Sequence, residues 1–126
     1  GPPVGAFAGS HAVTRDGAVL LVPTPGHSPA HQSVLLRDGD RHWLFAGDAV
    51  FDLGQAEREE VAGIVADVPA ARDTVARIRR QLAMSSTLLL AAHDPEARDR
   101  LRRGHGGLGG GRAQGGNPAA PSGTLA

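Results

Sequence analysis

The chain has 126 residues, which is enough for one domain or part of one. Its 13 basic and 13 acidic residues balance, so the composition gives no electrostatic reason to expect binding to nucleic acid or to a membrane. The absence of Cys excludes disulfides and thiolate ligands, and leaves His and carboxylate side chains to hold any metal. No run approaches the roughly 20 apolar residues of a membrane helix, and no signal peptide opens the chain, so we expect a cytoplasmic protein.

The first half of the chain predicts three strands. Residues 18–23 form a short apolar run after an Asp-Gly turn signal, which predicts a buried strand. Residues 24–30 contain two prolines and a glycine and predict a loop. Residues 32–37 and 42–46 then predict a pair of strands joined by a hairpin turn at residues 38–40.

The second half predicts a helix, a strand and a helix. Residues 52–68 are expected to be irregular, and residues 69–83 form an amphipathic helix with a proline in its first turn and an Arg-rich polar face. Residues 87–92 are an apolar strand, and Asp94 is expected to cap a short helix that runs to about Arg103. This order implies an α/β fold in which helices cover a mixed sheet.

The composition changes at Gly104, after which Gly, Ala, Pro and Ser dominate. Such a segment buries too little apolar area to offset its ordering entropy, so we expect residues 104–126 to be a disordered tail. Residues 1–103 are expected to form the folded part. No Met begins the chain, and we therefore expect it to start inside a longer protein.

Three polar side chains stand at the ends of predicted strands. His27 lies in a loop between two strands, whereas Asp48 and His93 each come directly after an apolar strand. Ligands collect at strand ends in open α/β sheets because loops converge there. Two imidazoles and a carboxylate suit Zn²⁺ or a similar divalent ion. Taken singly, each is more often a surface His or a turn Asp, but the three together favour a metal site.

Two further histidines need separate interpretations. His31 follows His27 by four positions, which on a helix would form a two-His face, but Pro29 between them argues against a helix. We expect His31 either to support a metal ligand without binding the metal itself or to lie at the start of a strand. His42 is expected to face solvent from its strand and receives no role.

Three segments resemble motifs of the metallo-beta-lactamase superfamily. Residues 24–33, TPGHSPAHQS, resemble its TPGH(T/S)PGHQS segment. Gly47-Asp48-Ala49 resembles its bridging-aspartate motif, and Ala92-His93-Asp94-Pro95 resembles its last histidine motif. The intervals between the motifs are similar to those of the N-acyl-homoserine-lactonase-like branch, and the resemblance covers roughly residues 12–103.

The resemblance implies that residues 1–103 are the C-terminal half of an αββα sandwich, with a mixed sheet and covering helices. It implies that His27 binds the first of two metal ions, that Asp48 bridges both ions in catalysis, and that His93 binds the second. Zinc is favoured by the ligand types, and Mn, Fe or Co would fit the same set. In this family a metal-bound hydroxide attacks a carbonyl, and the two cations stabilise the attacking and leaving oxygens.

The sequence departs from the family pattern in three respects. The family's HxHxDH motif, which supplies four ligands N-terminal to these segments, does not occur in this sequence. Ala30 replaces the usual Gly of the first motif. Phe51 stands where lactonases often have a Tyr that helps to hold the substrate, and this chain contains no Tyr. We expect Phe51 to contact the substrate.

We therefore expect a metal-dependent hydrolase of a lactone or another small ester or thioester, of the quorum-quenching kind, present here as a C-terminal part with an incomplete metal site. The chain alone is expected to bind metal weakly and to show little or no activity. A non-catalytic remnant that binds a partner is the alternative. A third possibility is that copies of the chain associate with one another, because half of a sandwich would expose apolar surface.

Overall fold

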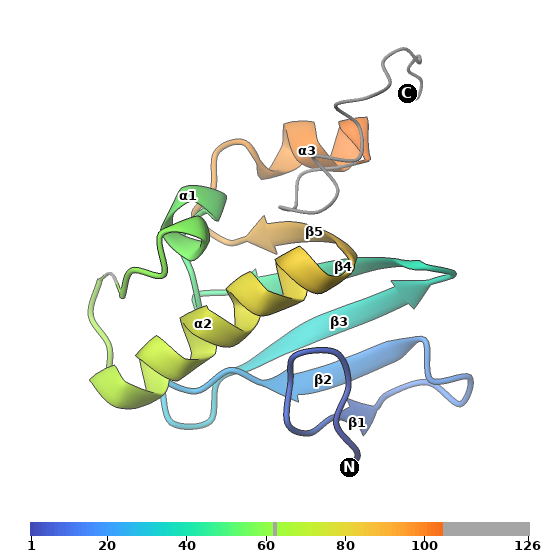
Figure 1. Ribbon diagram of the computed structural model, residues 1–126, viewed down its shortest axis with the longest axis horizontal. Coiled ribbons are helices and arrows are strands. Elements are labelled where there is room, and N and C mark those ends of the chain that lie inside the picture. The colour runs from blue at the N-terminus through green and yellow to red at the C-terminus, as the bar shows by residue number, and fades with distance from the viewer. Residues whose placement is uncertain (62, 105–126) are drawn as a thin grey trace.

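The computed structural model of the protein describes residues 1–61 and 63–104 (Figure 1). These residues form a five-stranded sheet in the order β1-β2-β3-β4-β5. The strands are β1 (His11–Ala12), β2 (Val19–Pro23), β3 (Gln32–Asp38), β4 (Arg41–Gly47) and β5 (Ser86–Ala91). The helices are α1 (Leu53–Glu57), α2 (Val68–Met84) and α3 (Ala97–Arg103). The predicted tail, apart from Gly104, lies outside the described residues.

The sheet is mixed, as predicted. Strands β1 to β4 pair antiparallel in sequence order, whereas β4 and β5 pair parallel. Parallel strands require a crossover connection, and α1 and α2 supply it. The β3–β4 hairpin lies where the sequence predicts it, because Asp38 pairs with Arg41 and Gly39 adopts a φ of 64° in the turn between them.

Helix α2 covers one face of the sheet (Figure 1). The carboxylate of Asp67 accepts the Ala70 N–H at 3.0 Å and caps the helix, whose first turn holds the proline that the sequence predicts. The apolar stripe of α2 is buried against the core-facing side chains of the strands, and its members are Val75, Ile78 and Leu82. Removing one such buried aliphatic side chain costs about 2–5 kcal/mol, so this contact contributes much of the fold's stability.

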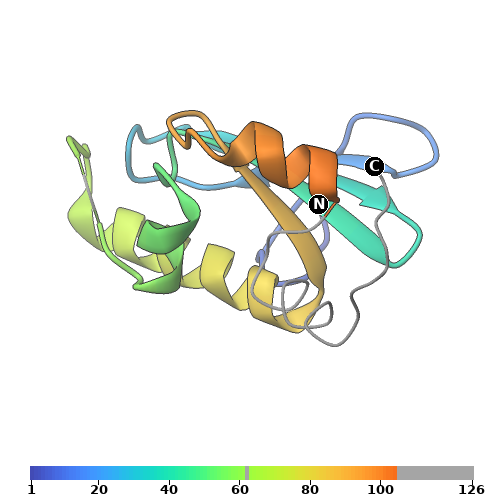
Figure 2. The same cartoon turned by 90° about the horizontal axis from the view of Figure 1, so that it is seen from above.

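Helix α3 lies on the opposite side of β5 from α2 (Figure 2). It leaves much of that outer face uncovered. The cross-strand pairs Val34–Phe45 and Leu36–Trp43 alternate with the core-facing positions of β3 and β4 and so point to this face. Phe45 is 42% exposed there. Among the described helices, none has the length and apolar character to cross a membrane.

The structure differs from the sequence-based prediction at two short elements and at one histidine. Helix α1 lies inside the segment expected to be irregular, and β1 was not predicted; both are too short to give a periodic signal. The prediction that His42 faces solvent is wrong. It alternates with Leu44 and Ala46 on the core side of β4 and is half-buried. Its Nδ1 is buried and finds no hydrogen-bond partner in the described part of the chain.

Candidate functional site

The loops that carry the three candidate side chains meet at one edge of the sheet. Gly47 at the end of β4 pairs with Ala91 at the end of the parallel strand β5. Asp48 therefore follows β4 beside the turn that carries His93. Strands β2 and β4 both pair antiparallel with β3, so β2 also ends at this edge, and the loop that leaves it carries His27.

The carboxylate of Asp48 lies between two imidazoles. Its Oδ1 is 2.9 Å from Nε2 of His93, and its Oδ2 is 3.7 Å from Nε2 of His27. The side chains of His27, Asp48 and His93 are 37%, 39% and 62% exposed, so the cluster is open to solvent. The structure thus brings together the three residues singled out in the sequence, with each imidazole on its own carboxylate oxygen.

The loop before His27 packs tightly on α2. Gly26 has a φ of 141°, and a Cβ there would lie 2.4 Å from the Cα of Ala71, so the close approach requires glycine. Nδ1 of His27 lies 3.0 Å from the carbonyl oxygen of Ile64. A carbonyl only accepts, so Nδ1 donates this hydrogen bond, and Nε2 faces the Asp48 carboxylate. The loop conformation therefore fixes both the position and the ring orientation of His27.

His31 supports the backbone of Asp48. The Asp48 N–H donates to Nε2 of His31 at 3.3 Å, and Nδ1 of His31 lies 2.9 Å from the hydroxyl of Thr24. That hydroxyl is in turn 2.8 Å from the hydroxyl of Ser33. Because Nε2 accepts, Nδ1 carries the proton and donates to the Thr24 hydroxyl. His31 therefore links the start of β3 to Asp48, the residue between the two other histidines.

Phe51 forms an apolar wall beside His93. The two ring centroids lie 5.1 Å apart in an edge-to-face arrangement. The Phe51 N–H donates to Oε1 of Gln55 at 2.6 Å, which ties the segment after Asp48 to the first turn of α1. Phe51 thus lies next to the cluster, at the position where the sequence resemblance expects a substrate contact.

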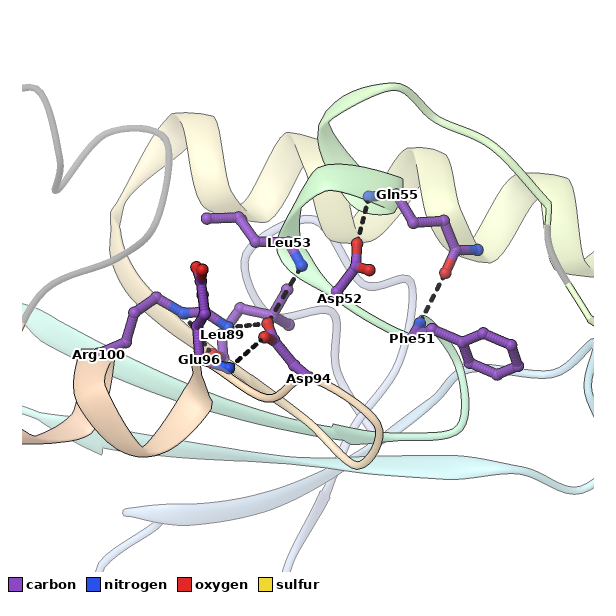
Figure 3. A network of polar contacts seen from close by, with 8 residues as sticks. All are labelled: Phe51, Asp52, Leu53, Gln55, Leu89, Asp94, Glu96 and Arg100. Carbon is purple, nitrogen blue, oxygen red and sulfur yellow. Dashed lines mark hydrogen bonds and ion pairs between the residues drawn. The ribbon is translucent and has the colours of Figure 1, made fainter.

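A buried ion pair joins Asp94, the residue that follows His93, to Arg100 of α3 (Figure 3). Nη2 of Arg100 donates to Oδ2 of Asp94, and both side chains are at most 5% exposed. Oδ2 of Asp94 also accepts the Leu53 N–H at 3.3 Å, and Oδ1 accepts the Glu96 N–H at 2.9 Å. Nε of Arg100 donates to the Leu89 carbonyl at 3.4 Å. Asp94 therefore joins the turn after β5 to α1 and α3.

The expectation that Asp94 caps the final helix is wrong. Helix α3 begins at Ala97, and its N-cap residue Glu96 makes no side-chain cap. The Asp94 carboxylate instead accepts hydrogen bonds from Arg100 and from the N–H groups of Leu53 and Glu96. The sequence analysis also missed Arg100. Four arginines crowd α3, and no sequence signal tells which of them turns inward.

The family model described as Metallo-beta-lactamase superfamily matches residues 1–105. The chain belongs to the metallo-beta-lactamase superfamily. Over 86 residues it is 30% identical to N-acyl homoserine lactonase AttM of Rhizobium radiobacter, an alignment that covers 68% of this chain and 33% of that relative. The chain thus spans about a third of the length of this curated member of the superfamily.

Solved structures of superfamily members share the fold. A structure of an N-acyl homoserine lactone hydrolase with the product N-hexanoyl-L-homoserine bound at the catalytic metal center matches with a TM-score of 0.61 and 26% identity. It covers 74% of this chain and 36% of that one. A structure of AiiA of B. thuringiensis with N-decanoyl-L-homoserine bound matches with the same TM-score, identity and coverage. The predicted α/β class, the mixed sheet and the lactonase-like branch are confirmed.

Membership of the superfamily implies metal ions, and the donors in this chain fit a share of such a centre. Within the described residues, no three or more His, Cys, Asp or Glu side chains are grouped so that they could hold an ion. The cluster instead offers two pairs of donors. Nε2 of His27 faces Oδ2 of Asp48, and Nε2 of His93 faces Oδ1. Imidazole nitrogen and carboxylate oxygen are donors that Zn²⁺ accepts, so the chemistry of each pair fits a divalent ion.

Proposed function

We propose that this chain carries the C-terminal share of the two-metal site of a hydrolase that acts on a lactone or another small ester or thioester. The observation that carries the proposal is the Asp48 carboxylate, each of whose oxygens faces the imidazole of a different histidine. A carboxylate in that arrangement suits a bridge between two cations better than a ligand of one. A cytoplasmic location remains a prediction.

Similarity supports the choice of substrate class. The matched relatives are N-acyl homoserine lactonases by name, and two of the matched structures hold N-acyl homoserine products. N-acyl homoserine lactones are therefore the substrates to test first. Their hydrolysis by the full-length protein would make it a quorum-quenching enzyme.

In this proposal His27 and Asp48 would hold one metal ion, and His93 and Asp48 would hold the other. Zinc suits these donors, and Mn, Fe or Co would also fit them. Bound there, the two ions would polarise the ester carbonyl and make water a stronger nucleophile at neutral pH.

The protein's own groups orient this share of the site. The Ile64 carbonyl holds the His27 ring, and His31 holds the backbone N–H of Asp48. Hydrogen bonds of this kind to metal ligands fix tautomer and ring orientation. Phe51 would contact the apolar part of the substrate beside His93, because an aromatic edge there offers packing but no hydrogen bond.

The site in this chain is incomplete in this proposal. No HxHxDH motif occurs in the sequence, and each ion would receive only two donors from the residues assigned here. We expect weak metal binding and little or no hydrolysis by the chain alone. The alternative, a non-catalytic remnant, also predicts an inactive isolated chain, so inactivity of the chain does not distinguish the two.

We also propose that two copies of the chain associate through the sheet face that points away from α2. The described helices leave much of the outer face of β3 and β4 uncovered. There Phe45 is exposed and Val34, Leu36 and Trp43 are partly buried, an apolar surface of the kind that a second copy of the chain would cover. Such a dimer would bury this face without changing the edge of the sheet that carries His27, Asp48 and His93.

A zinc titration of the chain by calorimetry tests the proposed site. Asp48→Asn should weaken zinc binding at least tenfold, because the neutral amide cannot bridge two cations. The matched control is Asp40→Asn, an exposed carboxylate in the β3–β4 turn, which should bind as the unaltered chain does. Equal affinity of all three chains would contradict the metal assignment. Robust zinc-dependent hydrolysis of an N-acyl homoserine lactone by the chain would contradict the incomplete site.

A further inference from the structure

We propose that Arg100 is a positioning residue for the metal site: paired with Asp94, it holds the turn that carries His93. This inference rests on the proposed function, in which His93 binds a metal ion. Arg100 itself contacts neither His93 nor Asp48 in the hydrogen bonds and ion pairs of the structure, so its effect would pass through Asp94.

The burial of Arg100 is the first reason. It is 4% exposed, whereas Arg98, Arg102 and Arg103 on the same short helix are exposed. A guanidinium is almost never fully buried unless it is paired. Its partner Asp94 has a side chain that is 3% exposed. Because both charged groups have lost their hydrating water, each depends on the other as its partner, and this fixes the geometry of the pair.

The contacts of the pair are the second reason. Arg100 reaches across from α3 to the Leu89 carbonyl on β5 and to Asp94 in the turn. Asp94 accepts the Leu53 N–H at the start of α1. The pair therefore connects three elements that surround the turn after β5 (Figure 3). His93 is the residue directly before Asp94 in the sequence.

The exposure of His93 is the third reason. Its side chain is 62% exposed, and its polar and aromatic partners among the described residues are the Asp48 carboxylate and the Phe51 ring. Little packing holds the imidazole itself, so its position depends on the backbone that carries it. The neighbouring segment with Phe51 is tied to the same pair through Leu53. Loss of Arg100 would therefore displace His93 and Phe51 relative to one another.

The test uses Arg100→Met, which keeps the length of the side chain and leaves Asp94 without its cation. Arg100→Lys keeps the charge but loses the planar fork that serves Asp94 and Leu89 together. Arg102→Met is the matched control, because Arg102 lies on the same helix with a side chain that is 68% exposed. Circular dichroism and amide NMR spectra establish that each variant is folded.

Two readouts follow. The first needs no metal: the NOE between the ring protons of Phe51 and His93, whose centroids lie 5.1 Å apart, should weaken or vanish in Arg100→Met and persist in Arg102→Met. The second is Co²⁺ binding followed by absorption. The affinity should fall roughly 10- to 100-fold in Arg100→Met, as expected for residues that orient metal ligands, and Arg100→Lys should lie between that variant and the unaltered chain.

The outcomes separate the two proposals. A folded Arg100→Met chain with an unchanged NOE and unchanged Co²⁺ affinity overturns the role of Arg100. If Arg100→Met does not fold, Arg100→Lys decides: unchanged values overturn the role, and a weaker NOE with weaker affinity supports it. An unaltered chain that binds no Co²⁺ contradicts the proposed metal site, while the NOE still decides whether Arg100 positions His93.

Discussion

Nε2 of His93 lies 2.9 Å from Oδ1 of Asp48, although the two residues follow different strands. The parallel pairing of β4 and β5 explains this proximity, since Gly47 and Ala91 are register partners just before the two residues. The other oxygen of Asp48 faces His27 from the loop after β2. One carboxylate thus meets one histidine from each side of the sheet edge.

The first prediction concerns His31. Replacement by Ala removes the acceptor of the Asp48 N–H and the partner of the Thr24 hydroxyl. The backbone of Asp48 then loses the hydrogen bond that holds it in place. We expect zinc affinity to fall roughly tenfold, the lower end of the effect of residues that support ligands. Calorimetry of His31→Ala beside His11→Ala, an exposed histidine in β1, measures it. Identical affinities in both variants would show that His31 has no part in the site.

The second prediction concerns the loop that carries His27. Gly26→Ala should lower the free energy of unfolding by more than about 1 kcal/mol, because Ala disfavours positive φ and its Cβ would clash with Ala71 of α2. Gly39→Ala is the control, since its φ is also positive but nothing lies within 4 Å of the added Cβ. Urea unfolding should rank Gly26→Ala as the less stable variant. The reverse order would contradict the tight packing of this loop.

The third prediction concerns His42 and pH. Burial, with a smaller contribution from nearby Arg37, lowers the pKa of His42 below its usual value. The unfolded chain therefore takes up a proton first, and the folded state loses stability as pH falls through about 6.5, the pKa of an unperturbed histidine. His42→Leu removes this loss and the unpaired buried Nδ1.

Urea unfolding at pH 8 and pH 5.5 checks the prediction for His42. His42→Leu should be more stable than the unaltered chain by about 1 kcal/mol at the higher pH, since an unpaired buried polar group costs about 1–3 kcal/mol. The difference should grow at the lower pH. His11→Leu serves as control and should leave the pH dependence unchanged. A stability difference for His42→Leu that shrinks toward acid pH would contradict the assignment.

The fourth prediction concerns the outer face of the sheet. Phe45→Glu places a charge among the apolar side chains of β3 and β4 and should prevent self-association through this face. Met84→Glu, at a 56% exposed position on α2, is the control and should associate as the unaltered chain does. Sedimentation equilibrium with and without zinc measures the masses. A monomeric unaltered chain at every concentration would rule out the proposed association.

The sequence predicts the sheet and α2 well because these elements carry long, regular signals. The alternation in β3 and β4, the Asp-Gly turn between them and the apolar stripe of α2 agree with one another. Helix α1 was missed because five residues are too few for a helical period, and its cap depends on Asp52 accepting the Gln55 N–H. Short elements follow from tertiary contacts that the local sequence does not encode.

The candidate site was predictable only in part. His27, Asp48 and His93 could be selected from their positions after strands, because the topology brings those strand ends to one edge. The supporting contacts could not. The partner of His27 is a backbone carbonyl at Ile64, and the partner of Asp94 is one of several arginines in α3. Neither partner carries a residue-type signal, and only the folded chain identifies them.

Cadmium NMR of the chain loaded with Cd²⁺, a stand-in for Zn²⁺, tests most directly whether His27 and His93 bind two different ions. Two ions that share Asp48 predict two cadmium resonances, one of which disappears in His27→Ala and the other in His93→Ala. Asp48→Asn should weaken or remove both, and Asp40→Asn should leave both in place. A single resonance that is lost equally in His27→Ala and His93→Ala would contradict the account, because both histidines would then bind the same ion.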